Sequence, residues 1–117
     1  MKDNRVFLNH ILDEINFLIE ETKKIKFEQF MKDELLKRAC TRSLEIIGEA
    51  VKNLSPDFRK KYKDIEWKKI AGMRDKIIHY YFGVNWDVVW AMIKNQLSKL
   101  KEQIEKILNE VKDNNDN

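Results

Sequence analysis

The sequence predicts an all-α protein that folds as an up-and-down bundle of four to five helices. Apolar side chains recur every three or four residues along most of the chain, a spacing that places them on one face of an α-helix. Three glycines and one proline are the few turn formers in 117 residues, so long helices are expected. No segment shows the strict alternation of apolar and polar residues that is typical of a strand. These observations favour a helical bundle.

The length of the chain suits one hydrophobic core and is too short for two, so residues 1–112 are expected to form a single domain. The last five residues, 113–117, are all Asp or Asn and predict a disordered tail. No apolar run approaches the roughly 20 residues of a membrane helix, and the N-terminus lacks the apolar stretch of a signal peptide. The single cysteine, Cys40, cannot form an internal disulfide. A cytoplasmic protein with no membrane partner is the simplest interpretation.

Two amphipathic helices are expected in the first half of the chain. The first spans about 3–24, and its apolar stripe comprises Phe7, Ile11, Ile15, Leu18, Thr22 and Ile25. A polar link with two phenylalanines, 26–33, separates it from a second helix over about 32–53. The buried face of the second helix is predicted to comprise Leu36, Ala39, Cys40, Ser43, Ile47, Ala50 and Val51.

The second half begins with a helix-start signal. Ser55 can cap a short helical turn that has Pro56 at its first position and ends by Tyr62. A third long helix is expected over about 64–81, with Gly83 as a suitable stop. Asn85 can cap a fourth helix, predicted as one uninterrupted rod over about 86–111.

The third helix contains the most informative segment, Arg74-Asp75-Lys76-Ile77-Ile78-His79-Tyr80-Tyr81. A guanidinium binds phosphate bidentately and keeps its proton, whereas an imidazole changes its charge near neutral pH. Asp75 and His79 are four residues apart and share a helix face, so the carboxylate can hydrogen-bond one ring nitrogen and fix the tautomer. Arg74 lies about 140° around the helix from His79, so one helix does not easily close both around a phosphate. Two copies packed antiparallel could place two Arg/His pairs in one cleft.

Positive charge gathers where this segment begins. The net charge of the whole chain is +3, but residues 59–76 contain eight cations and three anions. Such a concentration suits a phosphate polymer, and Lys68, Lys69 and Lys76 are the expected RNA-binding side chains. The alternative interpretation is a solvated, lysine-rich loop.

The segment and its flanks resemble the HepT-type branch of the HEPN superfamily. The signature is an arginine, four residues, a histidine, any residue and a tyrosine, here Arg74, His79 and Tyr81. Ala71-Gly72-Met73 precedes it and Phe82-Gly83-Val84 follows it. With the upstream segments 44–51 and 54–56, the resemblance covers roughly 39–97. Such proteins are small and all-helical, and they are paired in prokaryotes with a minimal nucleotidyltransferase as toxin and antitoxin.

This resemblance implies a homodimeric toxin that is a metal-independent endoribonuclease. RNA carries its own nucleophile, the 2′-hydroxyl. Cleavage therefore needs a base for that proton, an acid for the leaving 5′-oxygen and a cation on the phosphorane. His79 fits either of the first two roles, Arg74 fits the third, and Asp75 supports His79. No cofactor or metal is predicted. The resemblance also implies that the cognate nucleotidyltransferase antitoxin adds AMP to the hydroxyl of Tyr81.

Plainer interpretations remain for each of these residues. His79 could stabilise a helix C-terminus, and Arg74 could be a surface ion-pair partner. Three tryptophans could stack on bases, but core or interface positions are more usual for Trp86 and Trp90. Cys40 is expected to be a buried, inert thiol. For the whole chain, the alternatives are a non-catalytic HEPN module that docks a nucleotidyltransferase and presents its substrate, or a plain helical dimerisation protein.

Overall fold

Seven α-helices make up the part of the chain that the structure describes, and no strand occurs there. The structure is a computed structural model that describes residues 3–79 and 85–115, the side chains of 74, 77–79 and 112–115 excepted. The helices are α1 (Asn4–Thr22), α2 (Phe27–Lys32), α3 (Glu34–Lys52), α4 (Pro56–Lys61), α5 (Trp67–His79), α6 (Trp86–Asn95) and α7 (Leu97–Asn115). The all-α prediction is confirmed. The count exceeds four to five because two segments are divided differently from the prediction.

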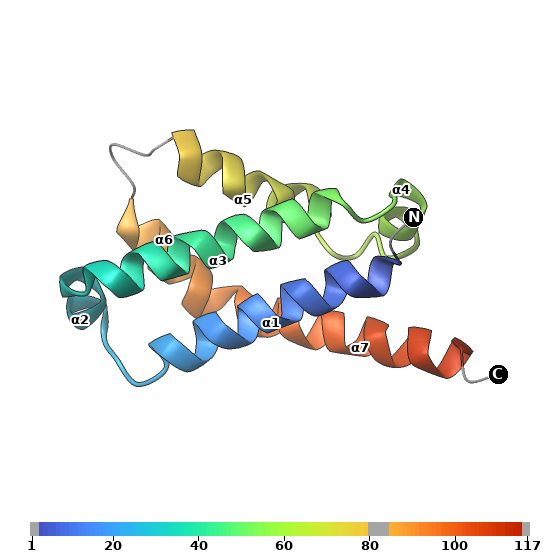
Figure 1. Cartoon of the computed structure of the whole chain (residues 1–117), viewed down its shortest axis with the longest axis horizontal. Helices are drawn as coiled ribbons and strands as arrows, with labels where there is room; N and C mark the ends of the chain where they lie inside the picture. The colour runs from blue at the N-terminus through green and yellow to red at the C-terminus, as the bar shows by residue number, and fades with distance from the viewer. Residues whose placement is uncertain (1–2, 80–84, 116–117) are drawn as a thin grey trace.

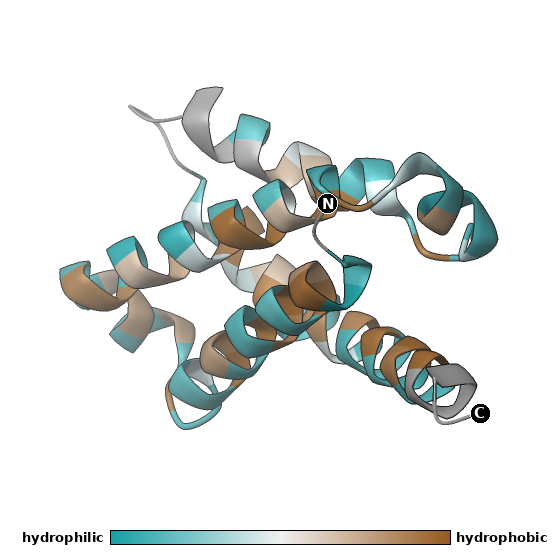
Figure 2. Cartoon of the chain, turned by 45° about the vertical axis from the view of Figure 1, so that its right-hand side comes forward, coloured by the Kyte–Doolittle hydropathy of each residue, from teal (hydrophilic) through white to brown (hydrophobic). Residues whose placement is uncertain are grey.

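The four longer helices α1, α3, α5 and α7 form the body of the molecule. α3 lies between α1 and α5, and α7 packs along α1 (Figure 1). Hydrophobic and hydrophilic residues alternate turn by turn along α1 and α7, as expected of amphipathic helices (Figure 2). The fully buried side chains between the helices include Leu8, Ile11, Ile15 and Leu18 of α1, Cys40, Leu44, Ile47 and Val51 of α3, and Ile104 of α7. Most residues of the predicted apolar stripes of the first two helices are therefore in the core, whereas Phe7, Ile25, Leu36 and Ala39 are only partly buried.

Side chains cap several helices at their first turns. Ser55 Oγ accepts a hydrogen bond from the backbone N–H of Phe58 at 3.2 Å, with Pro56 at the first position of α4. Asn85 Oδ1 accepts one from Val88 at 3.3 Å at the start of α6. Both caps are confirmed predictions. Asp3 and Asp33 cap α1 and α3 in the same way, which defines where these two helices begin.

The uninterrupted helix predicted over 86–111 is wrong, because the structure divides it at Gln96 into α6 and α7. Neither glycine nor proline marks the break, and two backbone hydrogen bonds span it, Gln96 to Met92 and Leu100 to Gln96. The chain bends there because α6 follows an aromatic cluster beside α2, whereas α7 follows α1. Helix α7 then continues to Asn115, three residues into the segment for which the sequence predicted disorder.

Two further boundaries differ from the sequence prediction. The polar link 26–33 contains a helix of its own, α2, which buries Phe30. Helix α5 begins at Trp67 and not near residue 64, because the backbone N–H of Trp67 closes a tight turn onto the carbonyl of Ile65 at 2.8 Å. The expected end of that helix, Tyr80 and Tyr81, lies outside the described residues, as does Gly83.

The tryptophans lie in the core or at its edge. The ring of Phe30 packs 5.9 Å from that of Trp86 and 5.0 Å from that of Trp90, centroid to centroid. Trp67 is 5% exposed, and its indole N–H donates to the carbonyl of Tyr62 at 3.0 Å. The core interpretation of Trp86 and Trp90 is thus confirmed.

Cys40 is fully buried in α3. Burial raises the pKa of its thiol to about 11, with smaller contributions from Glu21 and Asp33. The expected burial of Cys40 is confirmed, and a thiol that stays protonated is a poor nucleophile. Among the described helices, none combines the length and the apolar character needed to cross a lipid bilayer.

Candidate active site and nucleic-acid interface

Helix α5 contains both residues predicted to be catalytic, Arg74 and His79. It is continuous from Trp67 to His79, so the two positions are five residues apart on one regular helix and about 140° apart around its axis. Tyr81, the predicted modification site, lies outside the described residues. Asp75 and Lys76 are the described side chains of the segment 74–81, and both are exposed; Met73, just before it, is buried and fixes the helix against the core.

Asp75 forms an ion pair that joins two helices. Its Oδ1 atom lies 3.5 Å from Nζ of Lys52, the last residue of α3. Both side chains are substantially exposed, at 57% and 39%. Lys52 therefore adds a cation beside the segment that the sequence had singled out. The hydrogen bond predicted from His79 to Asp75 stays a prediction.

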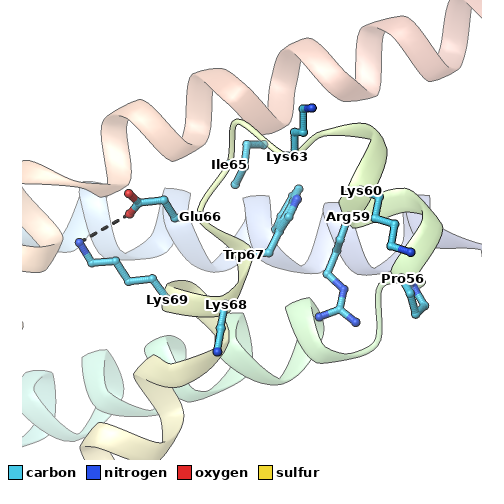
Figure 3. A pocket seen from close by; sticks show the side chains of 9 residues that line it. All are labelled: Pro56, Arg59, Lys60, Lys63, Ile65, Glu66, Trp67, Lys68 and Lys69. Atoms are coloured by element: carbon cyan, nitrogen blue, oxygen red, sulfur yellow. Dashed lines mark ion pairs between the residues drawn. The ribbon is translucent and has the colours of Figure 1, made fainter.

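A broad hollow lies at the N-terminal end of α5. It has a volume of about 810 Å³ and is lined by residues of α4, of the following turn and of the first turn of α5 (Figure 3). Its lining residues are Pro56, Arg59, Lys60, Lys63, Ile65, Glu66, Trp67, Lys68 and Lys69. We call this site the basic hollow, because five of the nine lining residues are cations and one is an acid.

Hydrogen bonds and ring contacts fix the apolar part of the basic hollow. Ile65 and Trp67 are each 5% exposed. The ring of Phe58 packs against both Tyr62 and Trp67, with centroids 4.9 and 6.3 Å away. The Tyr62 hydroxyl donates to Glu110 of α7 at 3.3 Å. Cations therefore surround a part of the fold that is tied to another helix.

The turn before α4 is also tied to α1. The side chain of Asn4 accepts a hydrogen bond from the Ser55 backbone N–H at 3.1 Å, and its amide donates to Ser55 Oγ at 3.4 Å. These bonds link the first turn of α1 to the N-cap of α4. The helix that supplies Arg59 and Lys60 is therefore held at both ends, by α1 before it and by Tyr62 after it.

Some cations around the basic hollow are paired with a carboxylate and others are not. Glu66 pairs with Lys69, with 3.6 Å between Oε2 and Nζ (Figure 3). Among the described residues, no carboxylate lies within ion-pair distance of Arg59, Lys60, Lys63 or Lys68. The Nε atom of Arg59 is buried and has no hydrogen-bond partner among the described residues. A buried donor left without a partner costs about 1–3 kcal/mol.

The three lysines predicted to bind RNA do not form one cluster. Lys68 and Lys69 line the basic hollow. Lys76 lies apart, in a smaller groove of about 450 Å³ between α5, α6 and α7, which Lys69 also lines and which includes Val88 and Met92. The sequence showed the charge of 59–76 but did not single out Arg59, Lys60 and Lys63. In the sequence, only the high charge density of this stretch pointed to these three residues. Their position beside the start of α5 depends on the turn at 62–66, which the sequence did not reveal.

No group of three or more His, Cys, Asp or Glu side chains within the described residues could hold a metal ion. The expectation of metal-independent chemistry stays a prediction.

The fold and the segment on α5 define a small all-helical protein with an arginine and a histidine on one helix, whose first turn borders a basic hollow. This chain belongs to the Ribonuclease HepT-like family, whose model matches residues 11–107. The HepT-type resemblance is confirmed, and it extends further than the expected 39–97, taking in most of α1 and much of α7.

Several relatives cover almost the whole chain. "Putative RNase TTE0752" of Caldanaerobacter subterraneus subsp. tengcongensis is 54% identical over 96% of this chain and 100% of its own length. "Putative RNase MJ0127" of Methanocaldococcus jannaschii is 41% identical over 99% of this chain and 96% of its own. "Probable ribonuclease HepT" of Thermococcus cleftensis is 41% identical over 91% and 96%. No solved structure gives a significant match.

Proposed function

We propose that this protein is an endoribonuclease that cleaves RNA by internal attack of a 2′-hydroxyl, and that it is the toxin of a toxin–antitoxin pair. The observation that carries the proposal is the placement of Arg74 and His79 on one continuous helix whose other end opens into the basic hollow. The names of the relatives, which call them ribonucleases, support the same activity.

The proposed reaction divides between an imidazole and a guanidinium. The 2′-oxygen forms a bond to phosphorus while the bond from phosphorus to the 5′-oxygen breaks, which leaves a 2′,3′-cyclic phosphate and a 5′-hydroxyl. His79 takes the proton of the attacking hydroxyl or supplies one to the leaving oxygen. Arg74 stabilises the charge that develops on the phosphorane. Asp75 orients His79 and is itself paired with Lys52.

The geometry of α5 favours a homodimeric active site. Positions 74 and 79 are about 140° apart around the helix, so one protomer does not easily direct both side chains at one phosphate. A two-fold contact repeats the same segment in one cleft and gives two histidines for the two proton transfers. Light scattering should therefore give twice the chain mass of 14.1 kDa. A mass of one chain at micromolar concentration would contradict this arrangement.

Control by the partner enzyme is proposed to act on Tyr81. Addition of AMP would place a phosphodiester two residues from His79, with the same charge as the RNA backbone. The cognate nucleotidyltransferase, with ATP and magnesium, should therefore silence the nuclease. Tyr81→Phe should fold and escape silencing. Silencing of that variant as complete as that of the wild type, or an adduct found on Tyr80 by intact-mass and peptide mass spectrometry, would place the switch elsewhere.

The direct test of the activity is incubation of the purified protein with RNA in EDTA. Products that end in 2′,3′-cyclic phosphate support the proposal. RNA that stays intact under these conditions, while the protein still binds the nucleotidyltransferase, would instead favour a non-catalytic module that presents a substrate to its partner.

A further inference from the structure

We propose that the basic hollow is a second RNA-contact site, which holds a backbone phosphate several nucleotides away from the phosphate that is cleaved. The inference rests on the proposed function in one respect, that RNA is the ligand. It adds a place on the protein where the strand is anchored, and it assigns that place to Arg59, Lys60 and Lys68.

The charges of the basic hollow select a phosphate. Lys69 is matched by Glu66, whereas Arg59, Lys60 and Lys68 have no carboxylate within ion-pair distance among the described residues. A concave surface lined by one sign of charge raises the local concentration of ions of the opposite sign. Arg59, which lines the basic hollow, adds a guanidinium that keeps its proton and can bind phosphate oxygens bidentately.

The apolar part of the basic hollow is held in place by contacts within the fold. Ile65 and Trp67 form its apolar part, and the indole N–H of Trp67 is already used by the carbonyl of Tyr62. In the view of Figure 3, Arg59 and Lys68 extend to one side of Trp67 and Lys63 to the other. Because Trp67 is 5% exposed, its ring is not available as a platform for a base. The site therefore suits a phosphate of the backbone and does not suit stacking.

The register of α5 connects this site to the proposed active site. Lys68, Gly72, Asp75 and position 79 follow one another at intervals of four, three and four residues, which places them along one face of the helix. The face rises about 16 Å from Lys68 to position 79. At Gly72 no described atom lies within 4 Å of the place where a Cβ would be, so this position leaves space on the face, and further along it Asp75 is paired with Lys52 of α3. A single strand lying on it reaches both sites.

The test measures RNA binding separately from cleavage. The variant Lys60→Gln/Lys68→Gln removes two exposed cations of the basic hollow, and Lys24→Gln/Lys106→Gln removes two exposed cations elsewhere. Both pairs are introduced into His79→Ala, so that the RNA is not cut. Binding of a fluorescent single-stranded RNA of about a dozen nucleotides is followed by anisotropy over a range of salt concentrations. Circular dichroism checks that both variants are folded.

We expect the Lys60/Lys68 variant to bind RNA more weakly. The slope of log K against log salt concentration should also be shallower, by about 0.7 for each phosphate that the protein no longer neutralises. The Lys24/Lys106 variant should match its parent. With His79 restored, the Lys60/Lys68 variant should raise KM for the longer RNA and leave KM for a dinucleotide unchanged, because a dinucleotide does not span both sites. Equal slopes and affinities in the two double variants would overturn the inference. RNA that is bound with the expected slopes but is never cleaved by the wild-type protein would overturn the proposed nuclease activity alone.

Discussion

The ammonium group of Lys52 lies 3.5 Å from Oδ1 of Asp75 and so joins the end of α3 to the middle of α5. The pair ties together the two helices on which the proposed active site depends. Because the two side chains are 39% and 57% exposed, their attraction is screened by water, and such pairs contribute about 0–1 kcal/mol. The ion pair therefore contributes little to the stability of the fold. It matters here because Asp75 lies beside Arg74 and His79.

Two matched variants separate the ion pair from the proposed role of the carboxylate. Asp75→Asn should reduce RNA cleavage, yet by less than the loss of His79, because the amide oxygen still accepts a hydrogen bond from the imidazole. Lys52→Gln breaks the same pair and leaves the carboxylate, so its cleavage rate should stay close to that of the wild type. Urea denaturation should show changes below about 1 kcal/mol for both. If the two variants lose the same activity, Asp75 acts through Lys52 and not through His79.

The sequence was most informative where local chemistry decides the structure. Most of the predicted stripes of α1 and α3 lie in the core, and the caps at Ser55 and Asn85 start α4 and α6 as predicted. The break at Gln96 could not be predicted from the local sequence, because the apolar spacing continues across it from Ile93 through Leu97 to Leu100. Only the packing of α6 against α2 and of α7 against α1 makes the chain bend there.

In the candidate site too, features within one helix could be predicted from the sequence, whereas features that depend on packing between elements could not. Arg74, Asp75 and His79 could be proposed from the sequence, because one helix carries all three and the flanking residues resemble a family signature; their roles stay predictions. Lys52 was not, because it comes from another helix. Nor was the basic hollow, because it exists only once the turn after α4 brings Arg59 and Lys60 next to Lys68.

Phe30 should be the most sensitive position of the aromatic cluster. Its side chain is fully buried between Trp86 and Trp90, and its loss would leave a cavity where α2 meets α6. Phe30→Ala should lower the free energy of unfolding by about 3–5 kcal/mol. The control is Leu35→Ala, because Leu35 is 81% exposed and its truncation should change stability by no more than about 0.5 kcal/mol. Equal losses in urea denaturation would show that the cluster does not stabilise the fold.

Gly72 offers a test of the open face of α5. It lies inside the helix, and a Cβ there meets no described atom within 4 Å. Gly72→Ala should therefore raise the free energy of unfolding by about 1 kcal/mol, the difference in helix propensity between the two residues. Thermal melting at several protein concentrations would check this. Destabilisation that grows with protein concentration would mean that a second copy approaches closely at this position.

Cys40 predicts a specific dependence of stability on pH. Burial raises its pKa from the ordinary value of 9.0 to about 11, so between these values the unfolded chain releases a proton that the folded chain retains. The unfolded state then binds fewer protons, and the free energy of unfolding falls as pH rises from about 9 to about 11. Comparison with Cys40→Ala isolates this contribution from the lysines and tyrosines. The same slope in both proteins would contradict the burial of the thiol.

The most direct test of the proposed active site is the rate of RNA cleavage by Arg74→Ala and by His79→Ala, each compared with the wild type in EDTA. We expect each substitution to lower the rate on the order of a hundredfold or more, since each removes a group that acts on the transition state at a cost of about 3 kcal/mol. Helicity and melting temperature should stay nearly unchanged. Full activity in either variant would contradict the assignment of the active site to α5.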